Sequence, residues 1–194
     1  MIKESVFWLA QIRQKKEIKT LLFLFLKLIK LVCETQENKK QSCNHNGVTI
    51  WLFNYERLLK NLKILKIKYQ VLIVSAHRTP KRMFDFAETA EKKGFAVIIA
   101  GAGGAAHLAG MVASLTTLPV LGVPIETKKL KGLDSLLSMA QMPKGIPIGC
   151  LAIDGAFNAG ILAASIISNF DDKVKSNLEK WRRIQTQSIK KKPK

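Results

Sequence analysis

The sequence predicts a doubly wound α/β fold, in which helices cover both faces of an open parallel sheet to form a three-layer αβα sandwich. From Val71 onward, short runs of β-branched and other apolar residues alternate with segments of helical periodicity. Such continuously apolar strands are typical of parallel sheets that are buried on both faces. In addition, eleven of the twelve glycines lie between Gly94 and Gly160, so strand ends and tight turns gather there.

The expected elements follow one another along the chain. Residues 56–68 have apolar side chains at helical spacing and lead into an apolar strand at 69–74, whereas residues 1–43 carry no clear fold signal. Apolar runs bounded by glycine or proline predict the later strands, and 3.6-residue periodicity predicts the later helices. We expect strands at 96–104, 119–125 and 146–153, and helices at 81–93, 106–115, 132–141, 157–168 and from Phe170 to about Ser188.

Length and charge favour one domain with basic ends. The 194 residues suffice for one sizeable core but not for two large domains. The net charge of +18 is concentrated at the ends, which lack the interleaved aromatic residues that stack on nucleic-acid bases. Solvated lysines are therefore favoured over a nucleic-acid partner. We expect a front segment at 1–43, an α/β domain at 44–170 that is degenerate over 44–63, a helix at 171–188 and a basic tail at 189–194.

Cysteine usage and hydropathy favour a cytoplasmic protein. Cys33, Cys43 and Cys150 are an odd number without a C-x-x-C pair, which predicts neither a disulfide framework nor a metal site. The most apolar run, residues 21–26, is much shorter than the roughly 18 residues that a membrane span needs. No membrane partner is therefore expected.

The first candidate site segment is Ser75–Pro80, which follows the carboxyl end of a predicted strand. Doubly wound folds bind their ligands at this edge of the sheet. His77 can transfer protons near neutral pH, and the neighbouring Arg78 can hold an anion. Thr79 and Pro80 suit the N-cap and the first position of the following helix, so the two charged residues are expected in the connecting loop.

The second candidate segment is Gly101–Ala106, which follows the next strand and precedes a helix that begins near His107. It matches the loose dinucleotide pattern G-x-G-x-x-G/A, with Glu126 about 25 residues further on, and so weakly suggests a nicotinamide enzyme. However, the motif follows an internal strand and does not open the domain. Gly103 and Gly104, followed by alanines, are better suited to hold a small reactant against backbone N–H groups.

Five segments carry a family resemblance: SAHRTP, IIAGAGGAAHLAGM, LPVLGVPI, GLDSLLSMAQMPKGIPIG and LAIDGAFNAGILAA. Over about residues 64–188, the chain resembles the class I N5-carboxyaminoimidazole ribonucleotide mutases of purine biosynthesis. The resemblance implies a flavodoxin-like fold and an isomerase that moves a carboxyl group from the exocyclic nitrogen of a ribonucleotide to ring carbon C4. It also implies a homo-octamer, and a reaction without ATP, metal or organic cofactor.

The same resemblance implies roles for individual residues. His77 is expected to act as general acid and base: it protonates the leaving amine and later removes the C4 proton. Arg78 is expected to bind the substrate phosphate, and the glycine–alanine loop to hold released carbon dioxide near C4. The substrate-binding residues that the resemblance implies are Ser75, Ala76, Arg78, Gly101, Ala102, Gly103, Gly104, His107 and Leu108.

The front of the chain departs from the family pattern, in which the first strand ends in G-S-x-S-D and binds phosphate and ribose. Gly47 stands at the position of that glycine, but residues 48–51 read V-T-I-W, and no aspartate precedes Asp85. The possible codons of residues 44–56, read one base later, permit the family's strand and loop, with glycine in place of the aspartate. We therefore hypothesise a one-base frame displacement that is restored before Val71.

Four functions remain open on the sequence alone. An active mutase is favoured, ahead of an inactive member of the same fold that lacks the phosphate and ribose contacts. A basic nucleic-acid-binding protein, which would show salt-dependent affinity for DNA or RNA, leaves the glycine-rich crevice unexplained. A nicotinamide dehydrogenase is disfavoured by the internal position of its motif.

Overall fold

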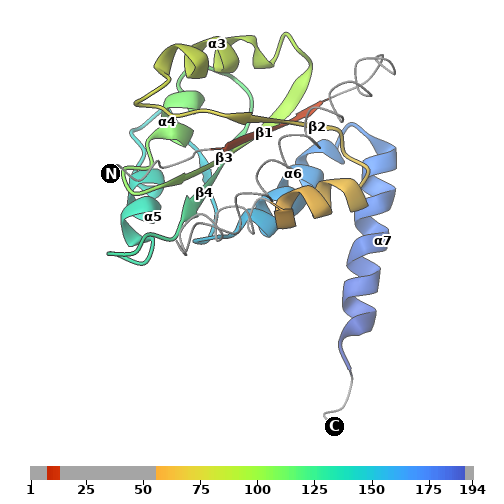
Figure 1. The fold of residues 1–194 in the computed structure, drawn as a ribbon. Helices are drawn as coiled ribbons and strands as arrows, with labels where there is room; N and C mark the ends of the chain where they lie inside the picture. Colours follow the sequence, from red (N-terminus) through yellow and green to blue (C-terminus); the bar gives the residue numbers. More distant parts are fainter. Residues whose placement is uncertain (1–7, 14–55, 191–194) are drawn as a thin grey trace, which may run out of the picture. The chain divides into compact units, whose positions relative to one another are not determined.

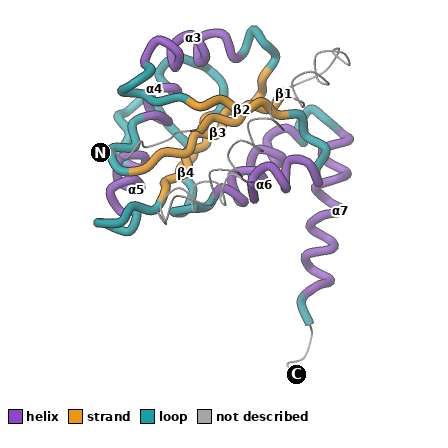
Figure 2. Tube along the Cα trace, viewed as in Figure 1, coloured by secondary structure: helices purple, strands orange, loops and turns teal. Residues whose placement is uncertain are grey.

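The computed structural model describes residues 8–13 and 56–190. These residues form an open sheet with helices packed against it (Figures 1 and 2). A helix over 56–64 precedes the second strand. The labelled elements are β1 (Trp8–Arg13), β2 (Tyr69–Ile73), α3 (Pro80–Ala90), β3 (Phe95–Gly103), α4 (Leu108–Ala113), β4 (Val120–Ile125), α5 (Leu133–Ala140), β5 (Gly149–Cys150), α6 (Ala156–Ile167) and α7 (Asp172–Ser188).

The helices and strands expected from residue 56 onward are present, with boundaries that differ by a few residues. The largest difference is β5, where the expected strand at 146–153 is reduced to two residues. Pro147 has no N–H to donate to a ladder, and β5 pairs with a single neighbour, β4, through Gly149 and Cys150. Pairing therefore begins only after the proline.

The sheet order is β2-β1-β3-β4-β5. β3, β4 and β5 are parallel, as the apolar runs predict, and β2 runs in the same direction. β1 lies between β2 and β3 and is antiparallel to both, although no element was expected within residues 1–43. Its backbone supplies hydrogen-bond partners to the inner edges of β2 and β3, which would otherwise lack them.

The core lies on both faces of the central strands. Every residue of β4 is buried, and so are seven of the nine residues of β3. Helices α3, α4 and α5 cover one face, where Met83, Leu108 and Met139 are fully buried or nearly so. On the other face, α6 packs closely on the helix over 56–64: a Cβ added at Gly160 would lie 3.0 Å from a Leu58 methyl group. The doubly wound arrangement is therefore present.

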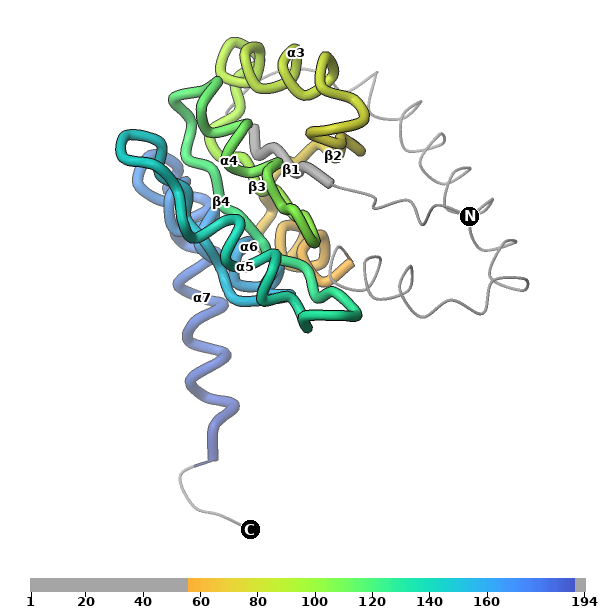
Figure 3. The backbone as a smooth tube through the Cα atoms, turned by 90° about the vertical axis from the view of Figure 1, so that its left-hand side faces the viewer, coloured from red at the N-terminus to blue at the C-terminus, as the bar shows by residue number. Residues whose placement is uncertain are grey.

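The last helix, α7, is anchored through its first half. The Asp171 carboxylate accepts hydrogen bonds from the backbone N–H groups of Lys173 and Val174, which is a regular N-cap. Val174 and Leu178 are buried, whereas every residue after Trp181 is exposed, and α7 extends away from the sheet (Figure 3). Within the described residues, no helix combines the length and apolar character needed to cross a bilayer.

Candidate functional site

The predicted site residues gather at the carboxyl edge of β2 and β3. Both strands are antiparallel to β1, so both end at the same edge of the sheet. The register shows this directly, because Trp8 pairs with Ile73 on one side and with Gly101 on the other. The first residue of β1, Trp8, therefore lies at this edge. A loop that follows β1, as in the family pattern, would begin after Arg13, at the opposite edge.

The loop after β2 is closed by its own hydrogen bonds. Thr79 Oγ1 accepts from the Ser75 backbone N–H at 2.8 Å and donates to the Ser75 carbonyl at 3.0 Å. The Ser75 hydroxyl in turn accepts from the backbone N–H and the Nε of Arg78, at 3.2 and 3.4 Å. Ser75 and Ala76 are buried, whereas His77 and Arg78 are exposed. The loop thus presents His77 and Arg78 to solvent from a base fixed by these hydrogen bonds.

Thr79 occupies the expected N-cap position and Pro80 the first helical position of α3. These predicted positions are confirmed, although the Thr79 side chain makes no capping hydrogen bond to the helix. Its hydroxyl is already engaged by both backbone groups of Ser75. The threonine therefore stabilises the loop that carries His77, not the start of the helix.

The two predicted histidines are in contact although they are 30 residues apart. His77 Nε2 lies 3.0 Å from His107 Nδ1, and the rings meet edge to face with centroids 5.1 Å apart. Only one hydrogen fits between the two nitrogens, so one ring donates and the other accepts. His107 is the N-cap of α4 and joins the glycine-rich loop to that helix. The pair therefore links the loop after β2 to the loop after β3.

The glycine-rich loop follows β3. Gly104 has a φ of +71°, a conformation that favours glycine, and a Cβ added there would meet no atom within 4 Å. Two serines of α5 contact this glycine: Ser135 accepts from its N–H at 2.8 Å, and Ser138 Oγ lies 3.3 Å from its carbonyl. Sequence reasoning missed both serines, because nothing in their spacing points to the loop.

Several predicted binding residues are buried. Gly101 and Ala102 lie inside β3, and Leu108 is 1% exposed at the start of α4. Ligand contacts at these positions are therefore limited to the backbone, whereas His77 and His107 present side chains. The substrate-binding roles of the whole set stay predictions.

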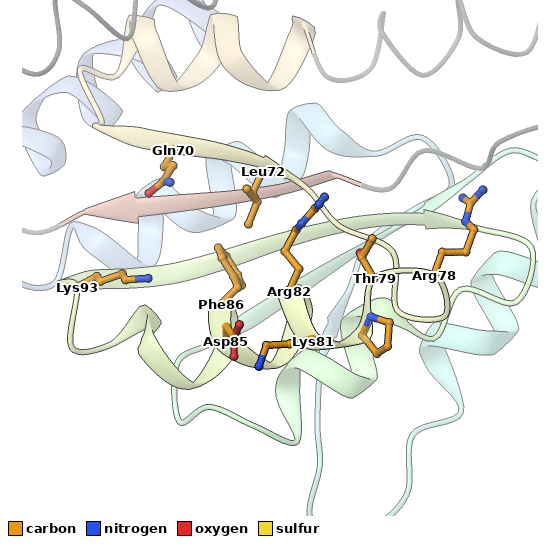
Figure 4. Close-up of a pocket in the computed structure, with 10 residues that line it drawn as sticks. Gln70, Leu72, Arg78, Thr79, Lys81, Arg82, Asp85, Phe86 and Lys93 are labelled. Atoms are coloured by element: carbon orange, nitrogen blue, oxygen red, sulfur yellow. The ribbon is translucent and has the colours of Figure 1, made fainter.

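A cleft of about 700 Å³ lies between β2 and α3 (Figure 4). Figure 4 shows Arg78 at one end of it and Lys93 at the other. Four cations and one carboxylate line the cleft, but neither histidine does. The lining residues are Gln70, Leu72, Arg78, Thr79, Pro80, Lys81, Arg82, Asp85, Phe86 and Lys93.

Cys150 lies at the end of β5, two strands away from β3 in the sheet. Burial raises the pKa of the Cys150 thiol, which disfavours its thiolate, the form that acts as a nucleophile. Among residues 56–190, no group of three or more His, Cys, Asp or Glu side chains is arranged to hold a metal ion. The frame-displaced segment proposed for residues 44–56 lies outside the described residues, except for the first residue of the helix over 56–64.

Comparisons with known proteins identify the family. Residues 53–188 match the AIR carboxylase family, which extends the resemblance seen in the sequence by about ten residues. An N5-carboxyaminoimidazole ribonucleotide mutase from Brucella melitensis is 54% identical over 134 residues, covering 68% of this chain and 83% of the relative. A mutase of the same name from Haemophilus influenzae is 56% identical over 127 residues, covering 64% and 77%.

The fold comparison agrees with the sequence comparison. The crystal structure of Treponema denticola PurE superposes with a TM-score of 0.65 and covers 71% of this chain and 86% of that chain. At 24% sequence identity this likeness supports the fold alone. A relative from Thermotoga maritima, also named N5-carboxyaminoimidazole ribonucleotide mutase, is 59% identical over 121 residues, covering 60% and 71%. The chain belongs to the AIR carboxylase family.

Proposed function

We propose that the chain is an N5-carboxyaminoimidazole ribonucleotide mutase, which moves a carboxyl group from the exocyclic nitrogen of its substrate to ring carbon C4. Relatives of that name are 54–59% identical to this chain over most of the described domain. The observation that carries the proposal is the exposed His77–His107 pair, with 3.0 Å between ring nitrogens, at the carboxyl edge next to the glycine-rich loop.

The chemistry needs one group that first donates and then accepts a proton. Protonated His77 donates to the exocyclic nitrogen as its bond to the carboxyl carbon breaks, which releases carbon dioxide and leaves the aminoimidazole. C4 then attacks carbon dioxide, and the neutral His77 removes the proton from C4. Each step leaves the imidazole ready for the next, so the cycle needs no external acid, base or cofactor.

The remaining residues hold the reactants. Arg78 binds the substrate phosphate from the same loop as His77, and the neighbouring Lys81 and Arg82 add positive potential. The loop over Gly103–Ala106 retains carbon dioxide close to C4, so that recapture competes with escape. His107 fixes the orientation of the His77 ring through its Nδ1.

The front of the chain weakens this site. The family match begins at residue 53, and β1 enters the carboxyl edge with its first residue, so the G-S-x-S-D loop has no counterpart among the described residues. We therefore expect weak substrate binding, which raises KM more than it lowers kcat. A second candidate, an inactive member of the family, is favoured by the same observation.

The proposed enzyme is a cytoplasmic homo-octamer. Exposed apolar side chains on α5 and α7, among them Leu133, Leu137 and Ile184, suit contacts between subunits. Sedimentation of the purified chain tests this assembly directly.

The test is conversion of N5-carboxyaminoimidazole ribonucleotide to its C4-carboxylated isomer by the purified chain and by His77→Asn. Turnover by the parent chain and its loss in the variant support the proposal. Absence of turnover in the parent at saturating substrate favours the inactive member, and equal turnover by both chains would contradict the role of His77. A parallel measurement of substrate binding separates a site that does not bind the substrate from one that binds it without reacting.

A further inference from the structure

We infer that Ser135 is a positioning residue for carboxyl retention: its buried hydroxyl fixes the backbone of Gly104, and with it the loop that keeps carbon dioxide near C4. The inference rests on the proposed function. It adds to that function a residue of α5 that lies outside the loops of the histidine pair.

The Ser135 hydroxyl is fully engaged by two backbone groups. It donates its one hydrogen to the Ile125 carbonyl at 2.7 Å and accepts from the Gly104 N–H at 2.8 Å. Ser135 is 0% exposed, so no water competes for either bond. One buried oxygen therefore ties the loop after β3 to the last residue of β4.

Hydrogen bonds rather than packing determine the position of Gly104. A Cβ at this residue would meet nothing within 4 Å, so no side chain presses on it from that direction. Its φ of +71° is also a conformation that glycine can leave easily, because glycine populates many others. The bond from its N–H to Ser135 is thus the principal restraint on this peptide.

Ser138 contributes less, although it lies on the same helix. Its hydroxyl donates to the Asp134 carbonyl at 2.7 Å, whereas the Gly104 carbonyl is 3.3 Å away. A hydroxyl has a single hydrogen, and the shorter bond takes most of it. Ser135 is therefore the residue whose loss would release the loop.

Release of the loop is expected to change the fate of carbon dioxide more than the binding of the ribonucleotide. Ser135 is buried beneath the loop and has no exposed atom that could touch substrate. A looser loop lets carbon dioxide leave before C4 captures it, because retention depends on effective concentration. Loss of the Ser135 hydroxyl should therefore lower the fraction of turnovers that keep the original carbon.

The experiment follows that carbon. Substrate labelled with ¹³C in the N5 carboxyl group is converted in buffer containing unlabelled carbon dioxide, and the label in the C4-carboxylated product is measured by mass spectrometry, corrected for spontaneous decarboxylation. We expect Ser135→Ala to lose the label about tenfold more often per turnover, with KM changed by less than about twofold. Ser135→Thr, which keeps the hydroxyl, should restore retention.

Ser165→Ala is the matched control, because Ser165 is also a helical serine whose hydroxyl donates to a carbonyl, that of Ile161 at 3.1 Å, but on α6. It should retain the label as the parent does. Equal retention by Ser135→Ala and the parent would overturn the inference while leaving the mutase activity standing.

Amide hydrogen exchange gives a second readout that needs no turnover. Exchange of the Gly104 N–H should quicken about tenfold or more in Ser135→Ala, with global protection unchanged, and should stay slow in Ser165→Ala. Unchanged exchange at Gly104 would refute the restraint itself. If the parent shows slow Gly104 exchange but no turnover, the proposed function fails, and the retention role fails with it, whereas the restraint stands.

Discussion

The two halves of the sheet differ in how they are built and in what they offer to a substrate. β3 and β4 run parallel and are buried on both faces. β3 ends in the glycine-rich loop, and each of the two strands is followed by a helix. β2 is a partly exposed edge strand, and its neighbour β1 is antiparallel. The first half carries most of the buried strand residues and the loop proposed to hold carbon dioxide, and the second carries His77, the proposed acid–base residue.

On the proposed function, this difference means that chemistry and substrate binding depend on different parts of the chain. His77 is carried by a loop that closes on itself through Ser75 and Thr79, and its ring contacts His107 at the start of α4. The G-S-x-S-D loop that the family resemblance implies for phosphate and ribose has, in contrast, no counterpart among the described residues. On the proposed function, a chain altered only at its front is expected to keep its acid–base residue and lose affinity.

The largest expected effect is that of His77→Asn. Removal of a general acid and base that serves both proton transfers should lower kcat by roughly 10²- to 10⁴-fold. His77 is exposed, so the unfolding midpoint should not change. Steady-state kinetics and urea unfolding measure the two quantities, and a variant that keeps more than a tenth of the parent's kcat would exclude His77 as the acid–base group.

A matched pair of isoleucines tests the contrast between the strands. Ile99 in β3 is 0% exposed and Ile73 in β2 is 59% exposed. Ile99→Ala should cost about 2–5 kcal/mol of unfolding free energy, because it removes buried methyl groups and leaves a cavity. Ile73→Ala should cost less than about 1 kcal/mol. Urea unfolding measures both, and equal costs would mean that β2 is covered as thoroughly as β3.

A matched pair of glycines separates strain from activity. Gly104 and Gly145 both have positive φ, and a Cβ at either position meets nothing within 4 Å. Alanine at each should cost about 1–2 kcal/mol of stability through backbone strain. Only Gly104→Ala places a methyl group in the proposed carbon dioxide loop, so it alone should lower kcat. Equal losses of kcat in both variants would argue against that loop.

The smallest expected effect is the pH dependence of Cys150. Burial raises the pKa of this thiol above its ordinary value, so the folded chain holds the proton more tightly than the unfolded chain. The stability that this contributes is present below the unfolded pKa and is lost as pH rises through the folded pKa. Alkylation with iodoacetamide should therefore show a higher pH midpoint in the folded chain than in urea.

This thiol measurement needs a background without Cys33 and Cys43, in which both are replaced by serine. Identical pH midpoints with and without urea would show that Cys150 is as hydrated in the folded chain as in the unfolded one. A lower midpoint in the folded chain would require a nearby cation that stabilises the thiolate.

Much of the fold after residue 56 could be predicted, because buried parallel strands leave an unmistakable apolar pattern. The expected helix at 157–168 and the observed α6 at Ala156–Ile167 differ by one residue at each end. β1 could not be predicted, because its pairing depends on the inner edges of two strands far along the chain and not on its own pattern. The short β5 follows from Pro147, which has no N–H to donate to the ladder.

The site was predictable where its chemistry is local and not where it depends on tertiary contacts. The proximity of His77 to His107 follows from strands that end at one edge, and motif resemblance named both residues. The engagement of the Thr79 hydroxyl with Ser75, rather than with α3, depends on loop closure that spacing does not show. The contact of Ser135 with Gly104 spans 31 positions and requires the finished fold.

The most direct test is to replace residues 44–56 with the family's strand and G-S-x-S-D loop. It compares the parent, which has His77 but not that loop sequence, with a chain that has both. The account predicts that this chain binds and converts N5-carboxyaminoimidazole ribonucleotide with a KM at least about tenfold lower than the parent's. It also predicts that His77→Asn abolishes turnover in the restored chain. A restored chain with unchanged KM, or one that remains active without His77, would contradict the account.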